Sequence, residues 1–184
     1  DKDDFTVPEH GGPARIAVSS RASQPITAVL MLDMSASMDD NVVRVREAAN
    51  RFVEALEPTD RLRIGSFGSE IVVNPLLTSD KTILQRVLRE ELWPGGSTRL
   101  WAAIDLAMQS IATETGRRTI VAITDGMDTT SLTQTAVTDR AIKGLFMIYA
   151  IGLEGKGLSQ RMMSLIAATG GAQARAEGAR NGPA

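Results

Sequence analysis

The sequence predicts an α/β fold, a doubly wound and mostly parallel sheet with one antiparallel edge strand and helices on both faces. Apolar runs of strand length alternate along the chain with segments whose apolar residues recur at helical spacing. The pair Gly68-Ser69 separates two consecutive strand-like runs and is typical of a hairpin, which supplies the antiparallel edge. The chain has 184 residues, enough for one such domain with a substantial buried core.

The chain divides into three parts in this interpretation. Residues 1–25 form an N-terminal segment, either a β-hairpin or the remnant of a preceding domain, and they contain a Gly-Gly-Pro turn signal. Residues 26–175 form the α/β domain, and the Gly- and Ala-rich residues 176–184 form a flexible tail. Because the first residue is Asp1 and not Met, we expect a processed product or an excised fragment.

Within the domain, the helix after the first strand has the clearest pattern. Val45, Ala49 and Val53 recur every four residues, and charged residues occupy the other faces. By the same criteria, strands are predicted at 26–32, 61–67, 70–73, 119–124 and 145–151, and helices at 41–56, 79–90, 99–113, 134–142 and 158–168.

Composition excludes several classes of function. The net charge of −2 and the isoelectric point near 5.5 leave no basic footprint for nucleic acid. The longest apolar runs have the length of a strand, far short of the roughly 20 residues of a membrane-spanning helix. The absence of cysteine excludes disulfides and thiolate metal sites, but it fits either redox compartment.

Oxygen-bearing side chains occur at three points where the predicted sheet presents its carboxyl edge. Asp33-Met34-Ser35-Ala36-Ser37 follows the first strand, Gly95-Gly96-Ser97-Thr98 precedes a helix, and Asp125-Gly126 follows the strand 119–124. Ligands of open α/β sheets bind at this edge. Small divalent cations such as Mg²⁺ prefer oxygen ligands. The three motifs together therefore predict a metal site, although each alone is explained by a helix cap or a turn.

This series of D-x-S-x-S, G-G-x-T and T-D-G motifs resembles the von Willebrand factor type A (VWA) family and its metal-ion-dependent adhesion site. The resemblance covers about residues 26–175. It implies a cofactor of Mg²⁺ or Mn²⁺, with Ca²⁺ as a further option, held by Asp33, Ser35, Ser37, Thr98 and Asp125. It also implies a partner protein that completes the metal's coordination with an Asp or Glu carboxylate, and no catalytic activity.

Two further acids stand near these motifs and are candidates for the rim of the site or for a second layer around it. Asp40 lies three residues after Ser37, where integrin β subunits have an acid that helps to hold an adjacent calcium. Asp128 lies three residues after Asp125. A solvated position in the first turn of the following helix is the simpler explanation for Asp40, and an exposed turn explains Asp128 equally well.

Other functions share part of this pattern. A VWA subunit of an AAA+ ATPase assembly of the chelatase or MoxR type would have the same site. A haloacid-dehalogenase-like phosphatase also has an Asp after its first strand, but it usually has a second Asp where this chain has Ser35. The only histidine is His10, in the N-terminal segment, so a hydrolase triad is not expected.

The two ends of the chain bear on location and regulation. Residues 1–25 resemble the stretch that leads into the VWA module of bacterial proteins that are often secreted or envelope-associated, which implies a periplasmic, secreted or cell-envelope location. After Gly171 the sequence shows no amphipathic helix of the kind that usually closes the family's domain. Affinity control by movement of such a helix is therefore not expected from these residues.

Overall fold

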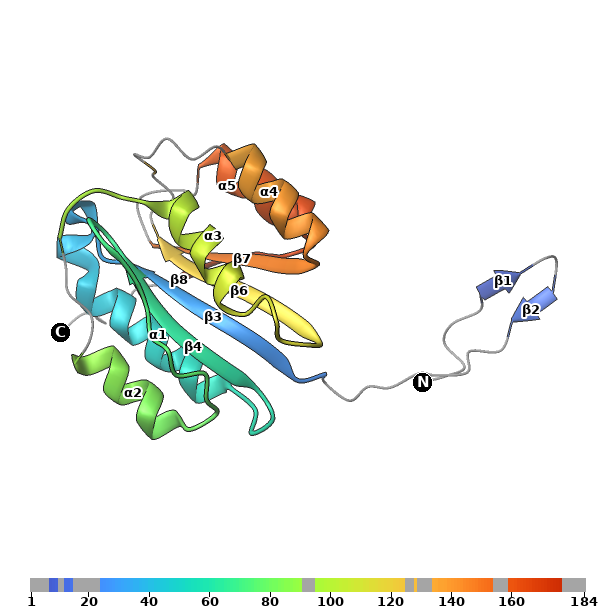
Figure 1. Ribbon diagram of the computed structural model, residues 1–184, viewed down its shortest axis with the longest axis horizontal. Coiled ribbons are helices and arrows are strands. Elements are labelled where there is room, and N and C mark those ends of the chain that lie inside the picture. Colours follow the sequence, from blue (N-terminus) through green and yellow to red (C-terminus); the bar gives the residue numbers. More distant parts are fainter. Residues whose placement is uncertain are drawn as a thin grey trace, which may run out of the picture.

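A twisted sheet forms the centre of the molecule, with helices on both of its faces (Figure 1). The computed structural model describes residues 7–9, 12–14, 24–90, 95–124, 128, 134–153 and 159–176. Within these residues the sheet has the order β5-β4-β3-β6-β7-β8. Its strands are β3 (Ile26–Asp33), β4 (Arg61–Phe67), β5 (Ile71–Val73), β6 (Arg117–Thr124), β7 (Phe146–Leu153) and β8 (Gln173–Ala176).

The predicted fold class is confirmed, including the antiparallel edge. β5 runs antiparallel to β4, whereas every other neighbouring pair in the sheet is parallel. β8 was not expected from the sequence, because Gln173-Ala-Arg-Ala176 lacks the β-branched and aromatic residues that favour strands. Its pairing with β7 makes it a strand despite this composition.

Five α-helices and one 3-10 helix cover the sheet within the described residues. α1 and α2 pack on one face, and α3, α4 and α5 pack on the other (Figure 1). Their bounds are η2 (Ala36–Asn41), α1 (Val42–Ala55), α2 (Lys81–Glu90), α3 (Leu100–Ser110), α4 (Gln134–Lys143) and α5 (Gln160–Ala168).

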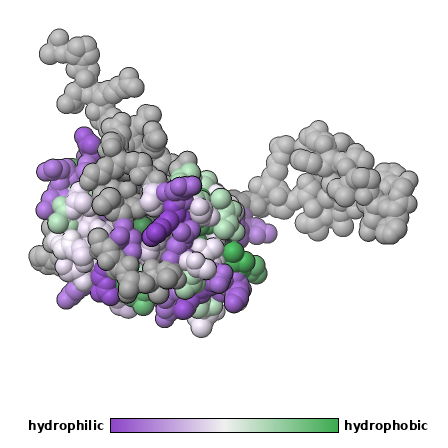
Figure 2. Space-filling model, turned by 90° about the horizontal axis from the view of Figure 1, so that it is seen from above, coloured by the Kyte–Doolittle hydropathy of each residue, from purple (hydrophilic) through white to green (hydrophobic). Residues whose placement is uncertain are grey.

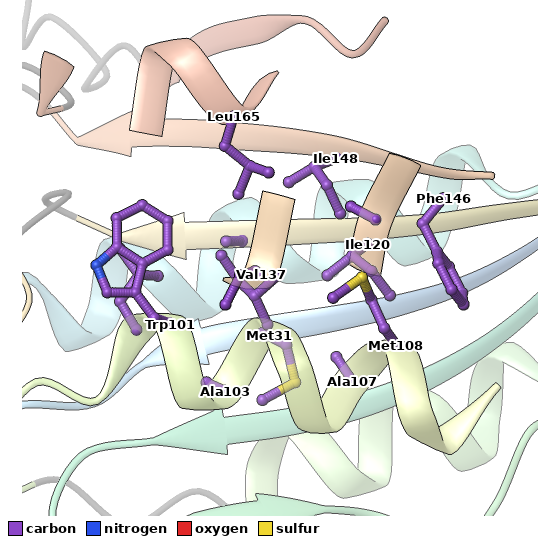
Figure 3. Close-up of a cluster of buried hydrophobic side chains, with 14 of the residues drawn as sticks. Met31, Trp101, Ala103, Ala107, Met108, Ile120, Val137, Phe146, Ile148 and Leu165 are labelled. Carbon is purple, nitrogen blue, oxygen red and sulfur yellow. The ribbon is translucent and has the colours of Figure 1, made fainter. Parts of the chain in front are cut away.

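The sheet separates two hydrophobic clusters, because successive side chains of a strand point to opposite faces. Met31 of β3 and Ile120 of β6 pack against Ala107 and Met108 of α3, beside Val137 of α4 (Figure 3). The alternate residues of the same strands, with α1 and α2, form the second cluster. Since β3 is buried along nearly its whole length, its carboxyl end is held in a fixed position.

The N-terminal segment contains a short antiparallel pair, β1 (Val7–Glu9) with β2 (Gly12–Ala14). The division of the chain at residues 25 and 175 stays a prediction. Apart from Ala176 at the end of β8, the predicted tail lies outside the described residues. No helix in the described part of the chain is both long and apolar enough to cross a membrane.

Asp60 ties the loop after α1 to the start of β3, and its replacement tests this connection. Its Oδ1 accepts a hydrogen bond from the Ile26 N–H (3.0 Å), and its Oδ2 accepts one from the Glu57 N–H (2.9 Å). Asp60→Ala leaves both donors without this buried partner, so we expect a loss of about 2–4 kcal/mol in the free energy of unfolding. Denaturant titration measures this loss. Asp60→Asn retains one acceptor oxygen and should lose less, and equal losses in the two variants would contradict this role.

Candidate metal centre

Asp33 is the last residue of β3, and its carboxylate lies at the centre of a buried polar cluster. The side chain is fully buried, and both carboxylate oxygens accept hydrogen bonds. Oδ1 accepts from the Ser35 backbone N–H (3.1 Å) and from the Ser35 hydroxyl (2.6 Å), and Oδ2 accepts from the Thr124 hydroxyl (2.7 Å). Because Thr124 ends β6, next to β3 in the sheet, the cluster joins two strand ends.

Ser35 and Ser37 extend this cluster toward solvent. Their hydroxyl oxygens lie 3.1 Å apart, Ser35 is buried, and Ser37 is exposed. Each hydroxyl has one hydrogen and two lone pairs, so a bond donated to Asp33 leaves the Ser35 oxygen able to bind a cation. The 3.1 Å separation is close to the roughly 3.0 Å between adjacent ligands of an octahedral Mg²⁺ with metal–oxygen distances near 2.1 Å.

Backbone hydrogen bonds fix the Gly-Gly loop against the Asp33–Ser37 segment. The Gly95 N–H donates to the Met34 carbonyl (2.7 Å), and the Ala36 N–H donates to the Gly96 carbonyl (3.0 Å). Thr98 follows two residues later and is buried, with 5% of its surface exposed. The structure therefore brings the first two predicted motifs together, although it leaves the role of Thr98 as a ligand a prediction.

Gly96 permits this close contact between loops. Its φ of +86° lies in the region that favours glycine, and a Cβ there would come within 1.5 Å of the Ser69 hydroxyl oxygen and 2.6 Å of the Ser69 Cβ. The Ser69 N–H in turn donates to the Gly95 carbonyl (3.1 Å). The loop between β4 and β5 thus also contacts the Gly-Gly loop.

The remaining predicted site residues have different outcomes. Asp125 lies outside the described residues. Asp40 is exposed within η2, on the same short helix as Ser37. Asp128 is half-buried, and its Oδ1 accepts a hydrogen bond from the Trp101 N–H (3.2 Å). Asp128 therefore satisfies a donor in the first turn of α3 from a distant loop, a role that spacing along the chain does not reveal.

Thr124 is the residue that sequence reasoning did not assign. It is fully buried and donates to Asp33, so it orients the carboxylate from the neighbouring strand. Its position directly before Asp125, at a strand end, was the available signal. The described residues contain no group of three or more His, Cys, Asp or Glu side chains placed to hold a metal. The donor set that they do contain is one carboxylate with several hydroxyls, all oxygen ligands of the kind that Mg²⁺ and Mn²⁺ accept.

The chain belongs to the von Willebrand factor type A domain family, whose profile matches residues 28–127. This range includes the Asp33–Ser37 segment and the Gly-Gly loop, so the predicted family is confirmed. A comparison with curated protein sequences finds no match.

Solved structures show the same fold at low sequence identity. An aerotolerance-related membrane protein from Bacteroides fragilis is 20% identical, with a TM-score of 0.69, and the match covers 84% of this chain and 92% of that one. A von Willebrand factor type A protein from Catenulispora acidiphila is 18% identical, with a TM-score of 0.68 and coverage of 85% and 39%. Proximal thread matrix protein 1 from the mussel byssus, with a zinc-occupied MIDAS motif, is 16% identical, with a TM-score of 0.71 and coverage of 83% and 42%.

Proposed function

We propose that this domain is a metal-dependent protein-binding module in which a divalent cation links the domain to a carboxylate of its partner. Asp33, Ser35, Ser37 and Thr98 would hold the cation, together with Asp125. The observation that carries the proposal is the buried Asp33 carboxylate, which is oriented by Thr124 and adjoins two hydroxyls at octahedral spacing. The zinc-occupied MIDAS motif of the mussel protein supports a metal at the equivalent place in the fold.

The donor chemistry favours binding over catalysis. Hydroxyl ligands are neutral, so the bound cation would keep much of its positive charge and attract a partner's carboxylate. Within the described residues, Asp33 provides the carboxylate of the cluster, and both of its oxygens accept hydrogen bonds from neighbouring residues. A general base would need a side chain that can approach a substrate and accept its proton, and no histidine occurs in the domain. We therefore propose that the domain has no enzymatic activity.

The metal and the location complete the proposal. We assign Mg²⁺ or Mn²⁺, because hydroxyl and carboxylate oxygens suit these ions, the sequence has no cysteine thiolate, and residues 26–175 contain no histidine. We propose a periplasmic, secreted or cell-envelope location and a role in adhesion. The similar Bacteroides fragilis protein is a membrane protein, which supports an envelope location.

Partner binding that depends on the metal is the experimental test. Immobilised domain should retain its partner from an envelope extract in Mg²⁺, release it in EDTA, and bind it again when Mg²⁺ is restored. High salt should only weaken the complex, because a coordination bond is less sensitive to screening than a surface ion pair. A partner retained undiminished in EDTA would place the interface elsewhere on the domain.

Thr98→Ala tests the site with a single hydroxyl. We expect partner binding to fall at least about tenfold, the lower end of the cost of losing a group that supports a metal site. The substitution should weaken partner binding by more than it disturbs folding, as measured by the melting temperature. Thr138→Ala is the matched control, because that hydroxyl bonds only the Gln134 carbonyl within α4 among the interactions described. Equal losses of partner binding in the two variants would contradict the assignment of Thr98.

A further inference from the structure

The turn between α4 and β7 presents a leucine to solvent at the edge of the sheet opposite the metal centre. Leu145 is 80% exposed, and Ile142, whose carbonyl accepts the Leu145 N–H (3.1 Å), is 48% exposed. The parallel register places this turn beside the starts of β6 and β3, since Phe146 pairs with Arg118 and Arg117 pairs with Ile26. In Figure 2 hydrophobic surface, drawn in green, lies at the right-hand side of the body.

Leu145 also has an unfavourable backbone conformation. Its φ is +54°, and it is the only residue other than glycine with a positive φ in the described part of the chain. This conformation costs a branched side chain about 1–2 kcal/mol, and glycine or asparagine adopts it more readily. Because the exposed side chain gains little from the protein's own core, the fold does not explain a leucine here. An outlier of this kind points to contact with something outside the domain.

A basic hollow adjoins the turn. Its volume is about 630 Å³, and Arg118, Arg140, Lys143 and Asp139 line it. Arg118 donates to the carbonyls of Ala112 and Gly144 and lies 4.6 Å from the centre of the Phe146 ring. Its buried Nε has no hydrogen-bond partner within the described structure.

Charge in and around this hollow is mostly positive. The Arg140 Nε is 2.9 Å from Asp105, so one of the three cations is partly neutralised, and Asp139 faces the hollow as a further acid. Lys143 is exposed, and Arg117 adds an exposed cation at the start of β6. The edge therefore combines two exposed aliphatic side chains with an excess of cationic groups.

We propose that this edge docks on an anionic phospholipid surface. Leu145 and Ile142 would enter the boundary between headgroups and acyl chains, and Lys143 with Arg118 would hold a lipid phosphate in the hollow. A lipid surface fits better than an acidic protein, because the aliphatic side chains project singly, Ile142 from the last turn of α4 and Leu145 from the turn after it, and neither lines the hollow. Interfacial insertion needs only such projecting apolar tips flanked by cations.

This docking would orient the metal centre. β6 runs from Arg117 at the lipid-facing edge to Thr124 at the metal centre, a distance of about 23 Å at 3.3 Å per residue. The metal site would point away from the membrane, toward a partner. The residues of the docking edge are different from those of the metal site, so a failure of either proposal leaves the other intact.

Co-sedimentation with vesicles tests the proposal, with the whole chain and two lipid compositions. The domain should sediment with phosphatidylglycerol-containing vesicles at low salt and dissociate from them in high salt. It should not sediment with vesicles of pure phosphatidylcholine. Leu145→Asn should weaken this binding about tenfold by removing the aliphatic group, while the melting temperature stays the same or rises. Lys143→Glu should weaken it by a similar factor through its charge. EDTA should have no effect, which separates this outcome from any failure of the metal site.

Val43→Asn is the matched control, because Val43 is 69% exposed on α1, away from this edge. It should bind vesicles like the parent. Indifference of the parent to phosphatidylglycerol, or equal vesicle binding by Leu145→Asn and Val43→Asn, would overturn the proposal. A protein complex that depends on Leu145, with no vesicle binding, would likewise overturn it and assign the edge to a protein partner.

Discussion

Asp33→Asn is expected to abolish or severely weaken divalent-cation binding without unfolding the domain. The substitution removes the negative charge at the centre of the cluster, and even supporting residues of a metal site typically change affinity by about 10–100-fold. Calorimetric titration with Mg²⁺ and with Mn²⁺ should show one site in the parent chain and weak or undetectable binding in the variant. Asp80→Asn is the control, since Asp80 accepts hydrogen bonds at the start of α2, remote in sequence from the metal motifs.

The fold should tolerate this change because an amide can retain most of the hydrogen bonds. The oxygen of the substituted side chain would still accept from the Ser35 N–H and hydroxyl, and its NH₂ group can donate to the Thr124 hydroxyl, which accepts as well as donates. A fully buried carboxylate also carries a desolvation cost that an amide does not. In EDTA, the free energy of unfolding of the variant should therefore equal or exceed that of the parent.

Metal should reverse this order of stability. A ligand that binds only the folded state adds about 2.7 kcal/mol at a concentration of 100 times its dissociation constant. Mg²⁺ should thus raise the melting temperature of the parent and leave that of Asp33→Asn nearly unchanged. Parent-like Mg²⁺ titration by the variant, or equal thermal stabilisation of both proteins by Mg²⁺, would show that Asp33 does not contribute to a metal site.

The elements that could be predicted from the sequence are those whose signal is local. β3 and β6 are continuous apolar runs ending in polar residues, and their burial on both faces matches what parallel strands require. The Asp33–Ser37 motif follows one of these runs directly. The rule that ligand sites lie at the carboxyl edge of such a sheet, applied to the three motifs together, therefore predicted where the candidate site lies, and binding of a metal there stays a prediction.

The parts that escaped prediction depend on contacts between distant segments. The hydrogen bond from Thr124 to Asp33 spans 91 positions, and the bond from Trp101 to Asp128 spans 27. β8 is a strand because β7 offers it an edge, not because of its own composition. A single sequence shows which residues can form such contacts, but the pairing itself is set by the tertiary packing.

Gly96→Ala is expected to lower both stability and Mg²⁺ affinity, although Gly96 is not one of the proposed metal ligands. The new Cβ would lie 2.6 Å from the Ser69 Cβ and 2.9 Å from its backbone nitrogen, so the two loops must separate. The Gly96 carbonyl, which accepts from the Ala36 N–H between the two motif serines, would move with them. We expect a loss of about 1–3 kcal/mol in the free energy of unfolding, from strain at the positive φ and from the clash, and a matching fall in Mg²⁺ affinity.

Gly95→Ala distinguishes the effect of backbone strain at a positive φ from the effect of the clash with Ser69. Gly95 also has a positive φ, +138°, but a Cβ there would meet nothing within 4 Å. This variant should lose stability through backbone strain while its loops stay in contact, so its Mg²⁺ affinity should fall less than that of Gly96→Ala. In the double variant Gly96→Ala, Ser69→Gly, removal of the Ser69 side chain takes away the shortest contacts and should restore part of the Mg²⁺ affinity. Equal Mg²⁺ affinities for Gly95→Ala and Gly96→Ala, with no recovery in the double variant, would mean that the contact between these loops does not position the metal site.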